Sequence, residues 1–241
     1  MKIAVIGGTG LIGSQVVKIL NASGHEAVPH SLSTGVDLLS GQGLPEEADV
    51  VVNLTNSPTF DDASPAFFQA TMDNLLAAAK AAGVGHAVIL SIVGADLAPD
   101  LAYYRAKVLQ EDILKAGPVP YSIVRATQFF EFMDAVLSWT ADESTVRLPA
   151  TLLQPIAAAD VAQAVADVSA GAPLQGTRDI AGPEVFALDK LGEITLAARG
   201  DHRVVVTDNS AGLFAAVASD ALIARDGAVI AATRYQDWLA R

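Results

Sequence analysis

The chain contains no cysteine in its 241 residues. Disulfide bonds, thiol catalysis and cysteine-bound metals are therefore excluded, and this composition suits a reducing cytoplasm. The four histidines are scattered, at positions 25, 30, 86 and 202, without the close spacing typical of metal ligands. We therefore expect no metal site and a cytoplasmic protein.

Basic residues are also scarce. Fifteen Lys and Arg stand against 27 Asp and Glu, which gives a formal net charge of −12. A nucleic-acid-binding surface needs clustered lysine and arginine, so this composition argues against a nucleic-acid partner. It does not argue against an anionic cofactor, because backbone amides alone can hold a phosphate.

Long hydrophobic runs are absent as well. No uninterrupted apolar stretch reaches the roughly 18–20 residues that a membrane-spanning helix needs. Glycines interrupt the apolar start of the chain, and no small-residue cleavage site of a signal peptide follows it. We therefore expect a soluble protein. Hydrophobic residues make up 51% of the chain and aromatic residues only 6%, which predicts a large aliphatic core.

Aliphatic segments alternate with helical patterns along the first half of the chain. Strands are predicted at 2–6, 26–30, 49–53, 86–91 and 119–125, with helices at 11–22, 65–82 and 101–116. This alternation is typical of an α/β fold with a doubly wound parallel sheet and helices on both faces. The segment 31–48 is too short for a full strand–helix unit, so the third strand is expected to be brief or its helix missing.

The alternation loosens after residue 126. Further helices are predicted at 129–141, at 159–169 with Asp160 as N-cap, and at 187–198. We expect a single domain over 1–241 with a small C-terminal substrate-covering lobe drawn from about 127–241, because ligands bind at the carboxyl ends of such strands.

Several side chains just after residue 127 allow two interpretations. The residues Phe129, Phe130, Phe132 and Met133 either wall a substrate pocket or pack in the core. The directions of Gln128 and Glu131 are not fixed by the pattern.

Residues Ile3 to Gly13 read IAVIGGTGLIG, a buried strand followed by a glycine-rich turn and the start of a helix. Glycines permit a tight turn and let the backbone approach a pyrophosphate, while the amides at the start of the helix face the phosphates. This pattern, in this strand–turn–helix context, predicts a dinucleotide-binding site.

A second group of residues suits proton transfer. Tyr103 and Lys107 lie four residues apart, on one face of a predicted helix, and Ser91 ends the strand before it. An ammonium group near a phenol lowers the pKa of the phenol. We expect Tyr103 to exchange a proton with a carbonyl or alcohol oxygen that Ser91 hydrogen-bonds. Tyr104 is turned by about 100° on the helix and is expected to pack elsewhere.

These segments together resemble the atypical short-chain dehydrogenase/reductase superfamily, and within it the NmrA-like NAD(P)-binding oxidoreductases. The resemblance covers nearly the whole chain. It rests on VIGGTGLIG, DVVVNLTN, TMDNLLAAAKAAGV, LSIVGAD, YYRAK, SIVRATQFFEF, QPIAAADVAQAVADV and IAGPE. It implies a Rossmann-type fold and catalysis by Ser91, Tyr103 and Lys107, with the lysine also holding the nicotinamide ribose.

The resemblance also implies a set of cofactor contacts. The pyrophosphate would be held by Gly7, Thr9, Gly10, Leu11 and Ile12. The adenine would lie by Asp37 and Leu38, and the ribose and the inner face of the nicotinamide by Leu54, Thr55 and Asn56. Ala126 and Thr127 would lie beside the nicotinamide ring.

The segment after the second predicted strand bears on the choice of cofactor. NAD-preferring relatives carry an acidic residue there and NADP-preferring ones often an arginine, whereas this chain has Leu32. Without the acid a 2′-phosphate is not repelled, and the hydroxyls of Ser31, Ser33 and Thr34 can donate hydrogen bonds to it. We therefore favour NADP(H), with NAD as the alternative.

The sequence thus predicts an NAD(P)H-dependent oxidoreductase that moves a hydride between the nicotinamide and a carbonyl, alcohol or quinone-like small molecule. One alternative is a non-catalytic NmrA-like redox sensor, although many such sensors lack the tyrosine that this chain keeps. Another is a sugar-nucleotide epimerase, for which 241 residues is short. The expected oligomeric state is a monomer or a homodimer.

Overall fold

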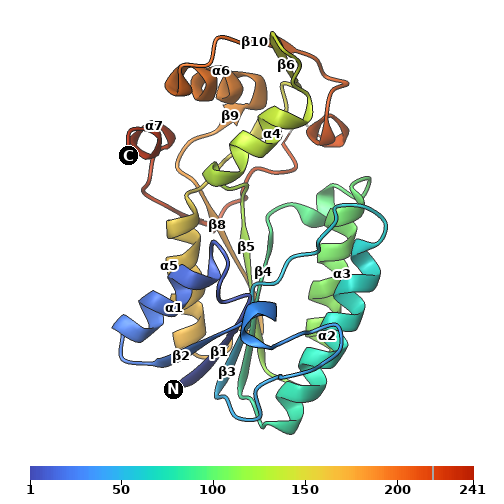
Figure 1. The fold of residues 1–241 in the computed structure, drawn as a ribbon, viewed down its shortest axis with the longest axis vertical. Coiled ribbons are helices and arrows are strands. Elements are labelled where there is room, and N and C mark those ends of the chain that lie inside the picture. The colour runs from blue at the N-terminus through green and yellow to red at the C-terminus, as the bar shows by residue number, and fades with distance from the viewer. Residues whose placement is uncertain (219) are drawn as a thin grey trace. The chain divides into compact units, whose positions relative to one another are not determined.

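The computed structural model describes residues 1–218 and 220–241, and the chain divides into two compact units (Figure 1). The first unit comprises Met1–Ile92, Ala102–Arg125 and Val161–Arg178. The second unit comprises Val93–Leu101, Ala126–Asp160 and Asp179–Arg241.

A seven-stranded sheet has the strand order β11-β8-β5-β4-β3-β1-β2. Its strands are β1 (Lys2–Ile6), β2 (Glu26–His30), β3 (Val50–Asn53), β4 (His86–Ile92), β5 (Tyr121–Ala126), β8 (Gly176–Ala181) and β11 (Val229–Ile230). β1 pairs in parallel with β2 on one side and with β3 on the other, and β3 pairs in parallel with β4. The chain therefore reverses its direction of winding between β1 and β3, where doubly wound sheets bind their ligands.

Helices cover both faces of this sheet, as the sequence predicts. In the first unit, α2 (Ser64–Ala81) and α3 (Ala102–Ala116) lie together on one face and α1 (Gly13–Ala22) lies on the other (Figure 1). Buried aliphatic side chains join α2 and α3 to the strands, among them Met72, Leu75, Ile89, Leu114 and Ile123. Burying each such side chain stabilises the fold by about 1.5–3 kcal/mol. The Rossmann-type prediction is confirmed.

The connection between β2 and β3 contains neither a strand nor an α-helix among the described residues. It forms one 3₁₀ turn, η1 (Leu32–Thr34), and an isolated bridge between Asp37 and Gln42. The side chain of Asn74 on α2 donates hydrogen bonds to the carbonyls of Leu38 (2.8 Å) and Leu39 (3.0 Å). This loop is therefore held by α2 rather than by a sheet neighbour.

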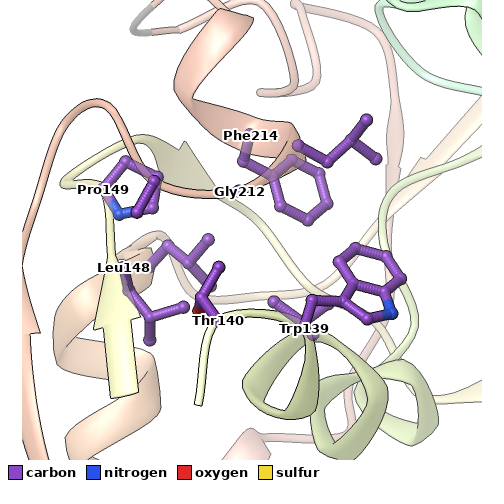
Figure 2. Close-up of a pocket in the computed structure, with 10 residues that line it drawn as sticks. Trp139, Thr140, Leu148, Pro149, Gly212 and Phe214 are labelled. Atoms are coloured by element: carbon purple, nitrogen blue, oxygen red, sulfur yellow. The ribbon is translucent and has the colours of Figure 1, made fainter. Parts of the chain in front are cut away.

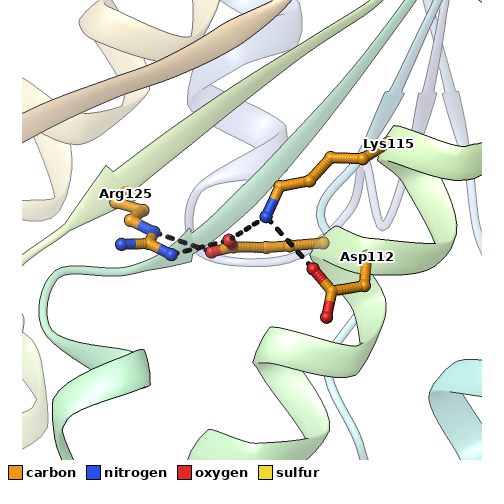
Figure 3. Close-up of polar contacts among 4 residues, drawn as sticks. Asp112, Lys115 and Arg125 are labelled. Carbon is orange, nitrogen blue, oxygen red and sulfur yellow. Dashed lines mark hydrogen bonds and ion pairs between the residues drawn. The ribbon is translucent and has the colours of Figure 1, made fainter.

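An ion pair fixes α3 against β5. The Glu111 carboxylate, whose side chain is fully buried, accepts hydrogen bonds from Arg125 Nε (2.8 Å) and Nη2 (2.7 Å), and Lys115 Nζ lies 3.4 Å away (Figure 3). Burial alone would raise the pKa of Glu111, but the hydrogen bonds from Arg125 hold it below its ordinary value. Removing one partner of such a buried pair is strongly destabilising.

The second unit has smaller elements. Its helices are α4 (Met133–Trp139), preceded by η3 (Phe130–Phe132), α6 (Leu188–Arg199) and α7 (Tyr235–Leu239), with the short 3₁₀ turns η2 (Ala95–Leu97) and η4 (Leu213–Ala216). Its two-stranded sheets pair β6 (Thr145–Leu148) with β10 (Val204–Thr207) in parallel, and β7 (Leu152–Leu153) with β9 (Phe186–Ala187) antiparallel. The predicted helix 129–141 is thus shorter, and the two small sheets were not predicted.

The N-cap predicted at Asp160 is wrong. Helix α5 (Ala158–Ala170) begins two residues earlier, so Asp160 lies within its first turn. The amide of Ala158 donates instead to Glu131 Oε2 (3.0 Å), and Glu131 Oε1 accepts a hydrogen bond from Trp238 Nε1 (3.2 Å). A carboxylate distant in sequence therefore caps the helix, where it also interacts favourably with the helix dipole. Within residues 1–218 and 220–241, no helix has both the length and the hydropathy needed to span a membrane.

Candidate functional site

The glycine-rich turn joins the carboxyl ends of three strands. Gly7 has a positive φ of 79°, and its amide donates to the carbonyl of His30 at the end of β2 (2.8 Å). A Cβ at Gly7 would lie 3.0 Å from the carbonyl carbon and oxygen of Leu54, just after β3. Only glycine fits this backbone angle and this approach without strain.

The other glycines of the turn fall into two groups: some are required by close packing within the chain, and one borders open space. A Cβ would lie 2.6 Å from Pro29 Cα at Gly8, and 2.2 Å from the Gly7 oxygen at Gly13. The chain's own packing therefore requires these two glycines. Gly10 is exposed, and a Cβ there would meet only the Gly7 oxygen among the described residues, at 3.3 Å. Gly10 leaves room on its outer side that a ligand backbone such as a pyrophosphate would use.

The start of α1 provides donors for an anion. Its N-cap, Ile12, makes no side-chain cap, and the first turn contains no acidic residue. The amides of Leu11 and Ile12 donate to no acceptor within the described part of the chain. Unpaired amides and the positive end of a helix dipole suit a phosphate group. Together with the open face of Gly10, these residues fit the pyrophosphate of a dinucleotide.

The loop after β2 keeps only part of the predicted phosphate contacts. The Thr34 hydroxyl accepts from the Ser31 amide (2.8 Å) and donates to the Ser31 carbonyl (3.0 Å), so it is used within the turn. The hydroxyls of Ser31 and Ser33 hydrogen-bond each other (2.8 Å), which leaves one hydroxyl hydrogen available. The Leu32 side chain is 78% exposed. Burial lowers the pKa of His30, so this imidazole adds no cation at neutral pH.

The predicted adenine contacts lie in the loop held by Asn74. The Asp37 carboxylate accepts from the Leu39 amide and from the Ser40 hydroxyl, each at 2.9 Å. Leu38 is buried and belongs to the apolar cluster under α2. Each Asp37 oxygen retains a second lone pair and can accept another hydrogen bond, so the contact with adenine stays a prediction.

Asn53, which the sequence analysis missed, shapes the chain after β3. It is buried, and its Oδ1 accepts from both the amide (3.0 Å) and the hydroxyl (2.7 Å) of Thr55. Its Nδ2 lies 3.5 Å from the sulfur of Met72. The next residue, Asn56, is exposed. Its position at a strand end is the one sequence signal that pointed to this segment.

Tyr103 extends from α3 to this loop. Its hydroxyl donates a hydrogen bond to Asn56 Oδ1, and its ring packs against Phe60 with centroids 4.8 Å apart. Burial raises the pKa of the Tyr103 phenol, with a smaller contribution from Tyr104 in the same direction, and the bond to Asn56 does not offset this. The expected lowering of this pKa by Lys107 is not what the structure shows, and the phenol is neutral at pH 7. Tyr104 is buried, as a packing residue would be.

Lys107 lies on the same face of α3 as Tyr103, but its ammonium is buried and binds groups inside the protein. Its ammonium donates to the Leu90 carbonyl (2.7 Å) and to Gln110 Oε1, and it lies 4.9 Å from the centroid of the Phe68 ring. Burial lowers the pKa of Lys107 to about 7, although Glu111 opposes the shift. Desolvation outweighs the carboxylate because no water reaches the ammonium. Its partner Gln110 had no signal in the sequence.

Ser91 faces the helical layer. It is buried and shares a face of β4 with Ala87 and Ile89, which pack in the cluster beneath α2 and α3. Its hydroxyl lies close enough to Glu111 to lower the pKa of that carboxyl, yet it makes no hydrogen bond of normal geometry to a described residue. Glu111 is two turns beyond Tyr103, about 12 Å along the helix axis. No hydrogen bond joins Ser91 to the Tyr103 hydroxyl in the described part of the chain.

Two predicted contacts of the nicotinamide belong to the second unit. The Ala126 carbonyl accepts from the Val93 amide (3.0 Å), and the Thr127 amide donates to the Ile180 carbonyl (3.1 Å). The Thr127 hydroxyl is buried and has no hydrogen-bond partner among the residues described. Their contact with the nicotinamide stays a prediction.

The second unit also contains a small apolar pocket beside α4 and η4. Trp139, Thr140, Leu148, Pro149 and Phe214 are among the side chains that line it (Figure 2). It has no charged side chain, so it offers nothing to bind a phosphate or to move a proton. No cluster of three or more potential metal-binding side chains occurs in the described ranges.

The strand order, the glycine turn and the open start of α1 define a dinucleotide-binding protein of the Rossmann type. A family model described as NAD(P)H-binding matches residues 43–170, which is more than half of the chain. The chain belongs to this NAD(P)H-binding family.

Solved structures share the fold at low identity. The dTDP-glucose 4,6-dehydratase of Streptomyces venezuelae, solved with NAD bound, is 18% identical, with a TM-score of 0.70 over 89% of this chain and 87% of that one. The UDP-glucose 4-epimerase of Thermus thermophilus, also with NAD, is 19% identical, with a TM-score of 0.67 over 86% of each chain. The triphenylmethane reductase of Citrobacter sp. is 16% identical, with a TM-score of 0.63 over 86% and 79%. No curated protein sequence matches the chain significantly.

We predict that Gly10→Val abolishes binding of NADPH and NADH while the fold survives. The valine side chain would fill the open side of the turn, but its Cβ approaches only the Gly7 oxygen of the described chain. Binding is measured by nucleotide fluorescence and folding by circular dichroism. Gly13→Ala is the matched control and should lose both, because its Cβ clashes with the turn itself. Normal affinity in a folded Gly10→Val protein would mean that the phosphates bind elsewhere.

A second prediction concerns the charge of Lys107. Its pKa is about 7 in the folded protein and 10.5 for an ordinary lysine. Between these values the unfolded chain holds a proton that the folded one lacks, so this residue makes the free energy of unfolding rise with pH over that range. The parent should therefore gain stability relative to Lys107→Met on going from about pH 7 to about pH 9.5, measured by urea unfolding. Lys18→Met, at an exposed lysine, should show no such change; a constant difference for Lys107→Met contradicts the prediction.

Proposed function

We propose that the protein is an NADP(H)-dependent oxidoreductase of the NmrA-like group. It would move a hydride between the nicotinamide and the carbonyl or alcohol carbon of a small molecule. The observation that carries the proposal is the Tyr103 hydroxyl, a neutral proton donor bound to a loop residue at the carboxyl edge of the sheet. That loop follows β3, the strand beside the glycine turn, at the point where the winding reverses.

The state of Tyr103 favours reduction of a carbonyl. When bound, the cofactor supplies a hydride to the carbonyl carbon, and the oxygen then needs a proton. A neutral phenol with a raised pKa holds its proton at neutral pH and can donate it in that step. The rings of Phe60 and Phe68 beside Tyr103 would exclude water from one side of the reacting group.

The remaining assignments rest on the resemblance. The pyrophosphate would be bound by Gly7, Thr9, Gly10, Leu11 and Ile12, the 2′-phosphate by Ser31 and Ser33, and the nicotinamide side by Leu54, Thr55, Ala126 and Thr127. Lys107 would reach the ribose only after leaving Gln110. For Ser91 as a ligand of the substrate oxygen, its position beside Glu111 gives no support.

A redox sensor is the second candidate. The Lys107 ammonium binds Leu90 and Gln110 rather than approaching the Tyr103 hydroxyl, which is the observation that favours a protein without catalysis. A sensor would bind NADPH and reduce no carbonyl compound. Oxidation of NADPH against a panel of ketones, aldehydes and quinones separates the two candidates, because only the enzyme consumes the nucleotide.

We predict that the protein binds NADPH several-fold more tightly than NADH. No acidic residue stands at the end of β2, and the Ser31–Ser33 pair has a hydroxyl hydrogen to donate. Both affinities are measured by nucleotide fluorescence at one salt concentration. Leu32→Arg should widen the preference, because this exposed position would add a charge-assisted contact to the 2′-phosphate. Equal affinities, or tighter NADH binding, contradict the prediction.

We further predict that Tyr103→Phe lowers turnover by about 10²–10⁴, the usual contribution of a positioned acid–base group. The change removes one hydroxyl, so NADPH affinity should be nearly unchanged. Steady-state reduction of the best carbonyl substrate of the panel gives kcat and KM.

Tyr104→Phe is the matched control for this experiment. Tyr104 packs in the core, so its variant should keep turnover close to that of the parent. A normal rate for Tyr103→Phe, or a loss confined to Tyr104→Phe, overturns the assignment. Tight NADPH binding without turnover of any panel compound favours the sensor.

A further inference from the structure

Asn56 is the residue in contact with the proton donor. Within the described ranges, it is the one side chain that hydrogen-bonds the Tyr103 hydroxyl. It is exposed, whereas the hydroxyl it binds belongs to a half-buried ring that packs against Phe60 and Phe68. The Tyr103 hydroxyl and the Asn56 amide therefore meet at the border between this half-buried ring and solvent, where a substrate oxygen can reach both.

The chain holds Asn56 in place from the sheet side. The amide of Leu54 donates to the Ile6 carbonyl (2.9 Å), and Asn53 binds both the amide and the hydroxyl of Thr55. The two residues before Asn56 are thereby fixed to β1 and β3. Leu54 also contacts Gly7 of the phosphate turn, so Asn56 follows directly on the segment that borders the nucleotide. The backbone that carries Asn56 is therefore held in place, and a held position is what makes a hydrogen-bond donor effective in catalysis.

The two residues expected to assist Tyr103 bind elsewhere. Lys107 donates to Leu90 and Gln110, and Ser91 lies beside Glu111. The Tyr103 hydroxyl is thus left with Asn56 as its polar neighbour. After giving up its proton, the phenol becomes an anion inside an apolar ring cluster, and an N–H donor at that point stabilises it.

We propose, on the basis of the reductase function proposed above, that Asn56 is a catalytic residue that shares the reacting oxygen with Tyr103. In the resting protein its Oδ1 accepts the phenol hydrogen. A carbonyl substrate takes over that hydrogen bond and leaves the Asn56 amide free to turn its Nδ2 hydrogens toward the oxygens. An asparagine amide carries both an acceptor and two donors, so one residue can perform both tasks.

The step balances without a further reactant. The carbonyl carbon would gain its new C–H bond from the hydride that a bound nicotinamide supplies, and the carbonyl π electrons move onto oxygen. The Tyr103 O–H bond breaks as its proton forms the alcohol O–H. The electron pair of that bond remains on the phenolate, which accepts an Nδ2–H hydrogen bond from Asn56 until solvent returns a proton. The nicotinamide is oxidised and the carbonyl compound is reduced.

The first test needs neither cofactor nor substrate. Protein labelled with 3-fluorotyrosine is titrated by fluorine NMR, and the Tyr103 signal is assigned by its loss in Tyr103→Phe. We expect Asn56→Ala to raise the titration midpoint of Tyr103 by roughly half a unit to one unit, because the charge-assisted Nδ2–H bond to the phenolate is stronger than the O–H bond to Oδ1 in the neutral form. The control Asp62→Ala changes an exposed residue of the same loop that pairs with Arg105, and should leave the midpoint unchanged. An unchanged midpoint in Asn56→Ala overturns the proposal.

The second test measures turnover with phenanthrenequinone and 4-nitrobenzaldehyde as carbonyl probes. Asn56→Ala should lower kcat about ten- to a hundred-fold, toward the lower end of what one preorganised donor contributes because this site borders solvent, with NADPH affinity within about twofold. Asn56→Asp should lose more, because its carboxylate is ionised at neutral pH and a negative charge opposes phenolate formation. Asp62→Ala should keep the parent kcat.

The outcomes separate this proposal from the proposed function. If Tyr103→Phe loses turnover and Asn56→Ala does not, the reductase stands and the role of Asn56 is overturned. If loss in Asn56→Ala comes with an equal loss of NADPH affinity, Asn56 is a cofactor ligand and the catalytic role is overturned as well. A parent protein that reduces neither these probes nor any compound of the panel overturns both proposals.

Discussion

The close approach of Gly13 to the carbonyl oxygen of Gly7 is the constraint on which the rest of the site depends. A methyl group at Gly13 would sit 2.2 Å from that oxygen, so α1 can begin there only without a side chain. This contact aims the first amides of α1 at the turn, and Gly7 in turn brings Leu54 of the β3 loop beside it. The close approaches of Gly13 to Gly7 and of Gly7 to Leu54 therefore position the start of α1 and the loop that carries Asn56, and the exposed Gly10 leaves open space beside them.

Helix α3, which carries Tyr103 and Lys107, is positioned by an ion pair. The buried Glu111 carboxylate receives two hydrogen bonds from Arg125 and so ties α3 to β5. Tyr103, Lys107 and Glu111 follow one another at four-residue intervals, so fixing Glu111 fixes the rotation of α3 and the face on which the other two lie. Along this face the environment changes from the loop at Tyr103 to the closed interior at Lys107. At both positions burial disfavours the charged form, so it raises the pKa of Tyr103 and lowers the pKa of Lys107.

The residue pattern predicted those features of the fold that interactions between residues close in sequence determine. Strands such as 26–30 and the glycine turn follow from periodicity and from the steric demands of a tight turn, and the structure has them. Spacing also placed Tyr103 and Lys107 on one helix face, but it carries no information on depth, so the partners Asn56 and Gln110 were out of reach. The N-cap prediction for α5 was wrong for the same reason. Asp160 has the right residue type, yet Glu131, distant in the sequence, accepts the hydrogen bond from the amide of Ala158. Long-range contacts decide such cases, and a single sequence does not contain them.

For the reductase function proposed above, the protonation state of Tyr103 favours reduction over epimerisation. The length of the chain does not separate the two activities, since the chain covers 86% of the Thermus thermophilus epimerase. An epimerisation that proceeds through transient oxidation of an alcohol must first remove the hydroxyl proton, which requires a base. A phenol whose pKa is raised by burial keeps its proton at neutral pH, so it is not in the phenolate form that could act as this base. Reduction of a carbonyl begins instead with a protonated donor, which is the form that burial stabilises. The same apolar surroundings make the phenolate that follows costly, so a donor such as the Asn56 amide contributes most after the proton has left.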